Sequence, residues 1–180
     1  MHLIFVRHGE TELNKLKKKM GQRIDDGLDE TGLEQAKEVL TKLPSNFSVI
    51  YSSPLKRAMH TAEIIAVHFD KQIIHKDELK ERDFGTLSGK TFDEMKAETG
   101  LEIEQLDDQL KYDYQPYGGE SVEQVKARLQ KFLTEIKTER KNDETVVVVT
   151  HFGLISLMNS LYPPIEHHKL SNATVHKFEI

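Results

Sequence analysis

The sequence contains no cysteine. This absence excludes disulfides, zinc sites built on thiolates and cysteine nucleophiles, and it is typical of proteins in a reducing compartment. Long apolar runs are also missing, since none approaches the ~20 residues that a membrane-spanning helix requires. The first residues lack the basic segment and apolar stretch of a signal peptide. Together these absences predict a cytoplasmic protein with no membrane partner.

An excess of positive charge is absent as well, because the formal net charge is -5. A negative balance disfavours a nucleic-acid partner, but it leaves room for a small basic pocket. The nine histidines raise the question of a metal site. However, His60 and His68 are expected on a helix and His167-His168 in a loop, and neither an HExxH motif nor a carboxylate cluster accompanies them. We therefore expect no metal and no cofactor.

Two short apolar runs, at residues 3–6 and 146–149, each lead into a histidine, His8 and His151. Such runs are typical of buried parallel strands, and ligands of an open α/β sheet bind beyond the carboxyl ends of its strands. If the two strands are neighbours, the imidazoles meet. One such histidine alone is most simply a strand cap. Two of them, each close to a glycine, favour a functional site.

The segments after these strands carry helix signals. Thr31 with Glu34 reads as a capping box, and Ser53 as N-cap with Pro54 at the first helical position predicts a helix as far as Phe69. Both helices precede or follow short apolar stretches, which is the pattern of helices that flank a sheet.

Residues 77–120 have a different character, because they are highly charged and weakly periodic. Thr91 and Glu94 offer a capping box and Gly100 a helix stop. We interpret this segment as a small helical lid over the carboxyl edge of the sheet.

Further strands are expected at residues 47–51, 72–75 and 175–178, the second of them at an edge. Ser121 and Gln124 are expected to cap a long amphipathic helix. The predicted fold is an α/β three-layer sandwich with a mainly parallel central sheet flanked by helices. At 180 residues the length predicts one domain, residues 1–180, with the lid inserted in it.

Short motifs follow one another in order along most of the chain. They are Arg7-His8-Gly9-Glu10-Thr11 with Asn14, Gly21-Gln22, the block from Tyr51 to Ala58, the block from Leu79 to Gly85, Gly118-Gly119-Glu120-Ser121, and the block at His151. In this order they resemble the signature of the histidine phosphatase superfamily, the phosphoglycerate-mutase-like proteins. The resemblance implies phosphate-ester chemistry.

The resemblance also assigns catalytic roles. His8 is expected to be the nucleophile that becomes phosphorylated, and His151 to stabilise the group in transfer. This agrees with the residues themselves, because a chain without cysteine has neutral histidine as its leading nucleophile for phosphorus. Glu81 is expected to be the general acid, and then the base for water. Asp83, on the same loop, is the next candidate for that role.

Phosphate binding should fall to donors at the carboxyl ends of the strands. Planar guanidinium groups suit phosphate oxygens, and backbone N–H groups at helix N-termini near Pro54 and Gly153 can add to them. The predicted phosphate-binding residues are Arg7, Asn14, Arg57 and His151.

Two features bear on the substrate. The lysines from Lys15 to Lys19 could attract an anionic substrate or could be a solvated face. Phe152 is bulkier than the small residue that relatives often have there, so it could narrow the pocket or turn away from it.

The stretch between Glu81 and Gly118 is short and lacks the arginine-rich segment by which cofactor-dependent mutases hold a diphosphorylated sugar acid. We therefore predict a phosphatase that acts on a small phosphorylated substrate or a phosphoprotein. A cofactor-dependent phosphoglycerate mutase and a non-catalytic phospholigand-binding protein remain as alternatives, and the oligomeric state stays open.

Overall fold

A computed structural model of the chain describes residues 1–108, 110–166 and 169–180; His167 and His168 lie outside the described residues. Within them one sheet has the strand order β3-β2-β4-β1-β5. Its strands are β1 (His2–Arg7), β2 (Ile50–Ser52), β3 (Ile73–His75), β4 (Thr145–Thr150) and β5 (Val175–Glu179). Only β5 runs antiparallel, beside β1, and the other neighbouring pairs are parallel. The sheet is therefore mainly parallel, as predicted, with β3 at an edge.

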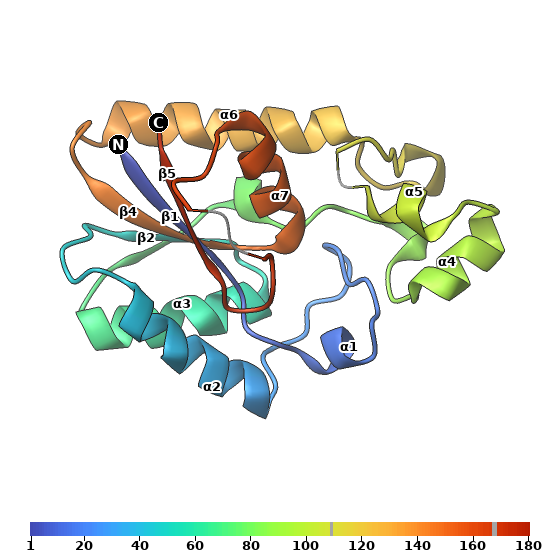
Figure 1. Cartoon of the computed structure of the whole chain (residues 1–180), viewed down its shortest axis with the longest axis horizontal. Helices are drawn as coiled ribbons and strands as arrows, with labels where there is room; N and C mark the ends of the chain where they lie inside the picture. The colour runs from blue at the N-terminus through green and yellow to red at the C-terminus, as the bar shows by residue number, and fades with distance from the viewer. Residues whose placement is uncertain (109, 167–168) are drawn as a thin grey trace.

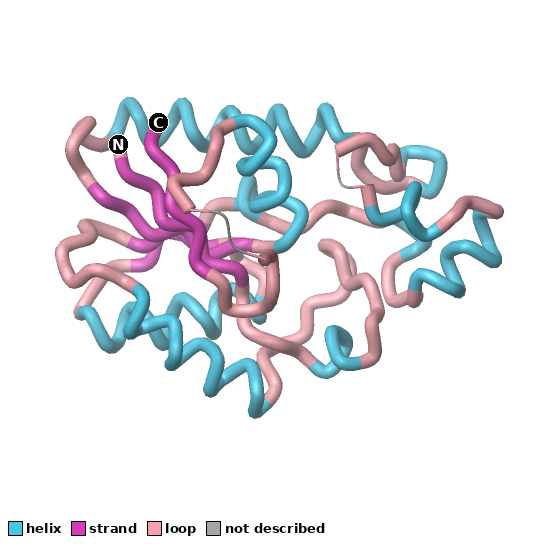
Figure 2. The backbone as a smooth tube through the Cα atoms, viewed as in Figure 1, coloured by secondary structure: helices cyan, strands magenta, loops and turns pink. Residues whose placement is uncertain are grey.

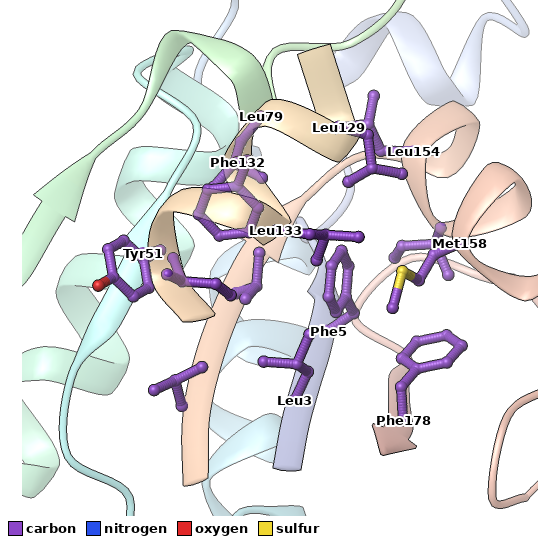
Figure 3. Packing of buried hydrophobic residues seen from close by; sticks show 14 of the residues in the cluster. Leu3, Phe5, Tyr51, Leu79, Leu129, Phe132, Leu133, Leu154, Met158 and Phe178 are labelled. Carbon is purple, nitrogen blue, oxygen red and sulfur yellow. The ribbon is translucent and has the colours of Figure 1, made fainter. Parts of the chain in front are cut away.

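Helices cover both faces of this sheet (Figure 1). Because successive side chains of a strand point to opposite faces, β1 supplies Leu3 and Phe5 to one core and Ile4 and Val6 to the other. The first core includes residues of α6 (Val122–Glu139) and α7 (Phe152–Leu161), and Figure 3 shows Phe5 and its neighbours there. The second includes residues of α2 (Glu30–Val39) and α3 (Lys56–Phe69). The predicted three-layer α/β sandwich is confirmed.

Two predicted helix starts are wrong. The helix expected to begin after Thr31 begins at Glu30, because the Asp29 carboxylate accepts the Gly32 N–H at 2.7 Å and caps the helix two residues earlier. The helix expected to begin at Pro54 begins at Lys56. The Ser53 hydroxyl oxygen contacts His151.

The segment from residue 77 to residue 120 forms short helices, the first of which packs against α6. They are η2 (Asp77–Leu79), η3 (Gly85–Leu87), α4 (Phe92–Thr99), α5 (Ile103–Asp107) and η4 (Gln115–Tyr117). Figure 2 shows α4 and α5 away from the sheet, joined to it by loops. A small separate core around Phe84, Met95 and Tyr114 holds the segment together. That this segment is a lid over the carboxyl edge of the sheet, and that residues 1–180 are one domain, stay predictions.

The capping boxes predicted outside the first two helices are confirmed. Thr91 and Glu94 exchange hydrogen bonds at the start of α4, and Gly100 ends that helix in the left-handed conformation with φ of 72°. Ser121 and Gln124 cap α6 in the same reciprocal way. The remaining short helices are α1 (Glu12–Lys15) and η1 (Leu40–Lys42). No helix in the described part of the chain has the length and apolar character needed to cross a bilayer.

Candidate active site

The two histidines predicted from the strand ends do meet. β1 and β4 are parallel neighbours with Arg7 opposite Thr150, so the residue after each strand lies at the same edge of the sheet. The rings of His8 and His151 are 5.1 Å apart between centroids, at an angle of 59°. Both side chains are buried, with 3% and 0% exposure.

The His8 ring is fixed in one orientation by its own loop. Its Nδ1 lies 2.7 Å from the carbonyl oxygen of Gly9, which can only accept, so Nδ1 carries the proton and donates it. Burial, together with the positive charges of Arg57 and Arg7, holds the pKa of His8 well below its ordinary value. The ring is therefore neutral at physiological pH, and its Nε2 keeps a lone pair.

The His151 ring is held by a side chain, not by its own loop. Its Nε2 lies 2.8 Å from the Ser53 hydroxyl oxygen, and its buried Nδ1 makes no hydrogen bond within the described residues. Burial and the charge of Arg57 hold the pKa of His151 well below its ordinary value. Nδ1 is therefore the ring nitrogen of His151 that has no partner among the described residues, and His151 is not one of the residues that line the pocket beside His8.

Two arginines supply positive charge beside His8. Arg57 is 1% exposed and donates to the carbonyl oxygens of Ile24, at 3.1 Å, and Gly21, at 2.7 Å. Arg7 donates to the carbonyl oxygen of Leu170 at 3.0 Å. Burial lowers the pKa of Arg57 to about 10 and also lowers the pKa of Arg7. Both guanidinium groups nevertheless stay charged at neutral pH. Each has a buried Nε without a hydrogen-bond partner in the described structure.

Glu81 lies in the same pocket as Arg7, His8 and Arg57. Its side chain is 9% exposed. One carboxylate oxygen accepts the backbone N–H of Arg82 at 2.8 Å, and the other accepts the N–H of Gly153 at 3.3 Å. The carboxyl group is therefore oriented by backbone donors from its own loop and from the start of α7.

Asn14 also lines this pocket, but a neighbour that sequence reasoning missed orients it. Its Oδ1 accepts the Thr11 N–H at 3.2 Å and the Nδ2 of Asn172 at 3.1 Å, which leaves its own amide N–H group as the donor for a ligand. Asn172 lines the pocket too, and also donates to the carbonyl oxygens of His8 and Gly9. The only signal for it was an Asn just before the last strand.

The backbone N–H groups expected to hold phosphate are engaged elsewhere. Gly153 donates to Glu81, and Lys56, at the start of α3, donates to the Asp25 carboxylate at 2.6 Å. The Gly9 N–H donates to the Thr61 hydroxyl oxygen at 3.2 Å. A Cβ on Gly9 would lie 2.4 Å from the carbonyl oxygen of Gly32, so glycine is needed there for close backbone packing.

The pocket has a cavity volume of about 350 Å³ and is strongly cationic. Lys17, Lys18 and Lys19 line it together with both arginines, and Glu81 is the carboxylate among its lining residues. Lys15 does not belong to this group, because its ammonium pairs with Asp29 at 2.9 Å and with Glu12 at 3.2 Å. The lysine run therefore divides into a pocket part and a surface part.

Phe152 does not turn away from the pocket but lines it. Its ring centroid lies 5.3 Å from the Arg7 guanidinium carbon and 6.0 Å from the Lys19 ammonium. Phe84 and Phe92, which sequence reasoning did not single out, line the pocket from the 77–120 segment. The site thus combines cations with apolar rings.

Among the described residues, no three His, Asp or Glu side chains gather closely enough to hold a metal ion.

Comparison with known families places the whole site in context. Residues 3–180 match the sequence model described as histidine phosphatase superfamily (branch 1). The chain is 37% identical over 151 residues to phosphoserine phosphatase 1 of Hydrogenobacter thermophilus, covering 83% of this chain and 70% of that protein. It is 36% identical over 156 residues to a 2,3-bisphosphoglycerate-dependent phosphoglycerate mutase of Parvibaculum lavamentivorans, covering 83% and 73%. Both activities thus occur among its relatives.

A solved structure of a phosphatase shares the fold of this chain. A mycobacterial glucosyl-3-phosphoglycerate phosphatase in complex with VO3 superposes with a TM-score of 0.81 at 28% identity, covering 98% of this chain and 91% of that one.

Proposed function

This chain belongs to the histidine phosphatase superfamily, and we propose that it is a metal-independent phosphomonoester phosphatase acting through a phosphohistidine on His8. The observation that carries the proposal is the state of His8, whose Nδ1–H is donated to Gly9 and whose Nε2 lone pair is left in a cationic pocket. A neutral imidazole that shares a pocket with the guanidinium groups of Arg7 and Arg57 can attack an anionic phosphoryl group without first losing a proton.

In the first step the Nε2 of His8 forms a bond to phosphorus while the bond from phosphorus to the ester oxygen breaks. Arg7 and Arg57 stabilise the negative charge on the equatorial oxygens, which is the main protein contribution to phosphoryl transfer. Glu81 enters this step as the carboxylic acid and gives its proton to the departing alkoxide. The products are an alcohol and phosphorylated His8.

In the second step Glu81, now a carboxylate, takes a proton from water as the water oxygen attacks phosphorus. The bond from phosphorus to His8 breaks, inorganic phosphate leaves, and both residues return to their starting states. His151 supports both steps through the Nδ1 that has no partner among the described residues. If the Ser53 hydroxyl donates to the Nε2 of His151, the proton of its neutral ring lies on Nδ1, where it can reach a phosphoryl oxygen.

The cations that line the pocket support a small substrate with a second anionic group. Arg7 and Arg57 can bind the phosphoryl group, and Lys17 and Lys18, which line the same pocket, can contact another charge on the alcohol part. Phosphoserine, the phosphoester in the name of one relative, has such a second anionic group.

A phosphoglycerate mutase is the second candidate, because relatives with that name cover most of the chain. A panel of phosphomonoesters on the pure protein, with a coupled mutase assay run with and without 2,3-bisphosphoglycerate, separates the two. A phosphatase releases inorganic phosphate in the panel and shows no mutase activity that depends on the bisphosphate. Tight phosphate binding without turnover of any ester would instead indicate a non-catalytic phospholigand-binding protein.

A further inference from the structure

The backbone that carries Glu81 is held by side chains from other parts of the chain. Arg128, on α6, donates to the carbonyl oxygens of Glu78 at 2.7 Å, Lys80 at 2.6 Å and Glu81 at 3.2 Å. Thr150 donates its hydroxyl to the carbonyl oxygen of Leu79 at 2.8 Å. Each carbonyl group from residue 78 to residue 81 is therefore bound by a side chain of α6 or β4.

The rest of the Arg128 guanidinium is bound as well. Its Nε donates to one carboxylate oxygen of Glu120 at 3.0 Å, and its Nη2 donates to the other at 3.1 Å. A guanidinium has five N–H donors, and these five hydrogen bonds use them all. The pair is mostly shielded from water, with side-chain exposures of 14% for Arg128 and 20% for Glu120.

Glu120 also binds the loop beyond Glu81. The carboxylate oxygen that accepts from Arg128 Nη2 also accepts the Asp83 N–H at 2.9 Å and the Gln22 amide at 3.0 Å. The Glu120 N–H donates to the carbonyl oxygen of Asp83 at 2.9 Å. The loop is thus fixed on both sides of Glu81, and Arg128 itself is not among the residues that line the pocket.

We propose that Arg128, together with Glu120, is a positioning residue that places the Glu81 carboxyl group at the leaving-group oxygen. The inference rests on the proposed function, in which Glu81 is the general acid. A shift of about 1 Å in a catalytic group can cost about 10²-fold in rate. Loss of Arg128 should therefore impair protonation of the leaving group and leave the phosphate-binding arginines as they are.

The test compares an alkyl phosphate with p-nitrophenyl phosphate through kcat/KM. In a reaction with a phosphoenzyme intermediate, kcat/KM reports only the steps up to release of the alcohol, so phosphoenzyme hydrolysis does not enter. Arg128→Met should lower kcat/KM for the alkyl ester by about 10²-fold. It should affect p-nitrophenyl phosphate much less, because p-nitrophenolate leaves without a proton. Arg128→Lys, which keeps a charge but not the fork, should show the same selectivity with a smaller loss.

A second variant and a control separate positioning from general loss of structure. In a Glu81→Gln background, Arg128→Met should add little further loss, because the two residues act on one step. Lys131→Met is the matched control, because Lys131 lies on the same helix and pairs with the Glu78 carboxylate at 2.5 Å rather than with the backbone. Its ratio of the two esters should equal that of the wild type.

Two results would overturn the assignment. Equal losses for both esters in the Arg128 variants, or the full loss repeated in the Glu81→Gln background, would make Arg128 a scaffold residue only. If circular dichroism shows that Arg128→Met does not fold, the same ratio in Arg128→Lys decides the question. A Glu81→Gln enzyme with no leaving-group preference would instead remove the acid role itself, and this inference with it.

Discussion

The Nδ1–H of His8 donates to the carbonyl oxygen of Gly9, the next residue in the chain, at 2.7 Å. This bond fixes the tautomer, and burial of the ring, together with the positive charges of Arg57 and Arg7, keeps it neutral by lowering its pKa. Nε2 is thereby prepared to accept a phosphoryl group. The same bond would stabilise the ring after phosphorylation, when the positive charge on imidazole strengthens its remaining N–H as a donor.

We expect a phosphoenzyme on His8 during turnover. Rapid quenching followed by mass spectrometry should find one added phosphoryl group on the peptide that contains His8, labile in acid and stable in base. His8→Ala should lose turnover, while His60→Ala, on the α3 helix, should keep it. Label on another residue, or full turnover by His8→Ala, would contradict the mechanism.

Glu81→Gln should lower kcat/KM for alkyl phosphates by ~10²–10⁴, the usual contribution of a general acid. The loss for p-nitrophenyl phosphate should be far smaller, since its leaving group needs no proton. The structure supports this role because two backbone N–H groups aim the Glu81 carboxylate within the His8 pocket. Asp83 is the comparison variant, since its carboxylate is engaged by Arg23 at 2.8 Å. If Asp83→Asn shows the leaving-group preference and Glu81→Gln does not, the acid is Asp83.

Much of this site could be predicted from local sequence. The strand ends led to His8 and His151, and motif resemblance led to Arg7, Asn14, Arg57 and Glu81. All of these except His151 line one pocket, and the His151 ring lies beside that of His8. Capping boxes at Thr91 and Ser121 were equally accessible, because their partners lie three residues away.

Contacts between distant parts of the chain were not predictable in this way. Asn172 binds Asn14 across 158 residues, and no periodicity or cap signals such a pair. Asp29 rather than Thr31 caps α2, and its carboxylate also pairs with Lys15, which lies on α1 and not beside it in the sequence. Gly153 was expected to bind phosphate, and only the fold reveals that Glu81 takes its N–H.

The lowered pKa values of the two buried histidines predict acid sensitivity. Below about pH 6.5 the unfolded chain binds protons at these positions. The folded chain does not, because the pKa values of His8 and His151 are well below that value. The unfolding free energy therefore rises with pH up to about 6.5 and falls as the pH is lowered, by up to roughly 1.4 kcal/mol per pH unit for each histidine.

Urea unfolding of the wild type and of His8→Asn, between pH 5 and 7 in buffers without phosphate, measures this effect. The wild type should lose stability faster on acidification, by the contribution of one histidine. Parallel pH profiles for the two proteins would mean that His8 titrates alike in both states. His68→Asn, on α3, removes a histidine outside the pocket and is the control.

The division of the lysine run predicts which lysines contact substrate. Lys18 lines the pocket, whereas Lys15 pairs with Asp29 and Glu12. An exposed charge pair contributes ~0.2–1 kcal/mol, so Lys18→Met should raise KM for phosphoserine by roughly 1.5- to 5-fold. It should change KM for p-nitrophenyl phosphate less, because that ester has no second anion, and the difference should shrink at high salt as screening increases. Lys15→Met should behave as the wild type with both esters. Equal effects of Lys15→Met and Lys18→Met would show that the lysines act only through the overall field and hold no second anionic group.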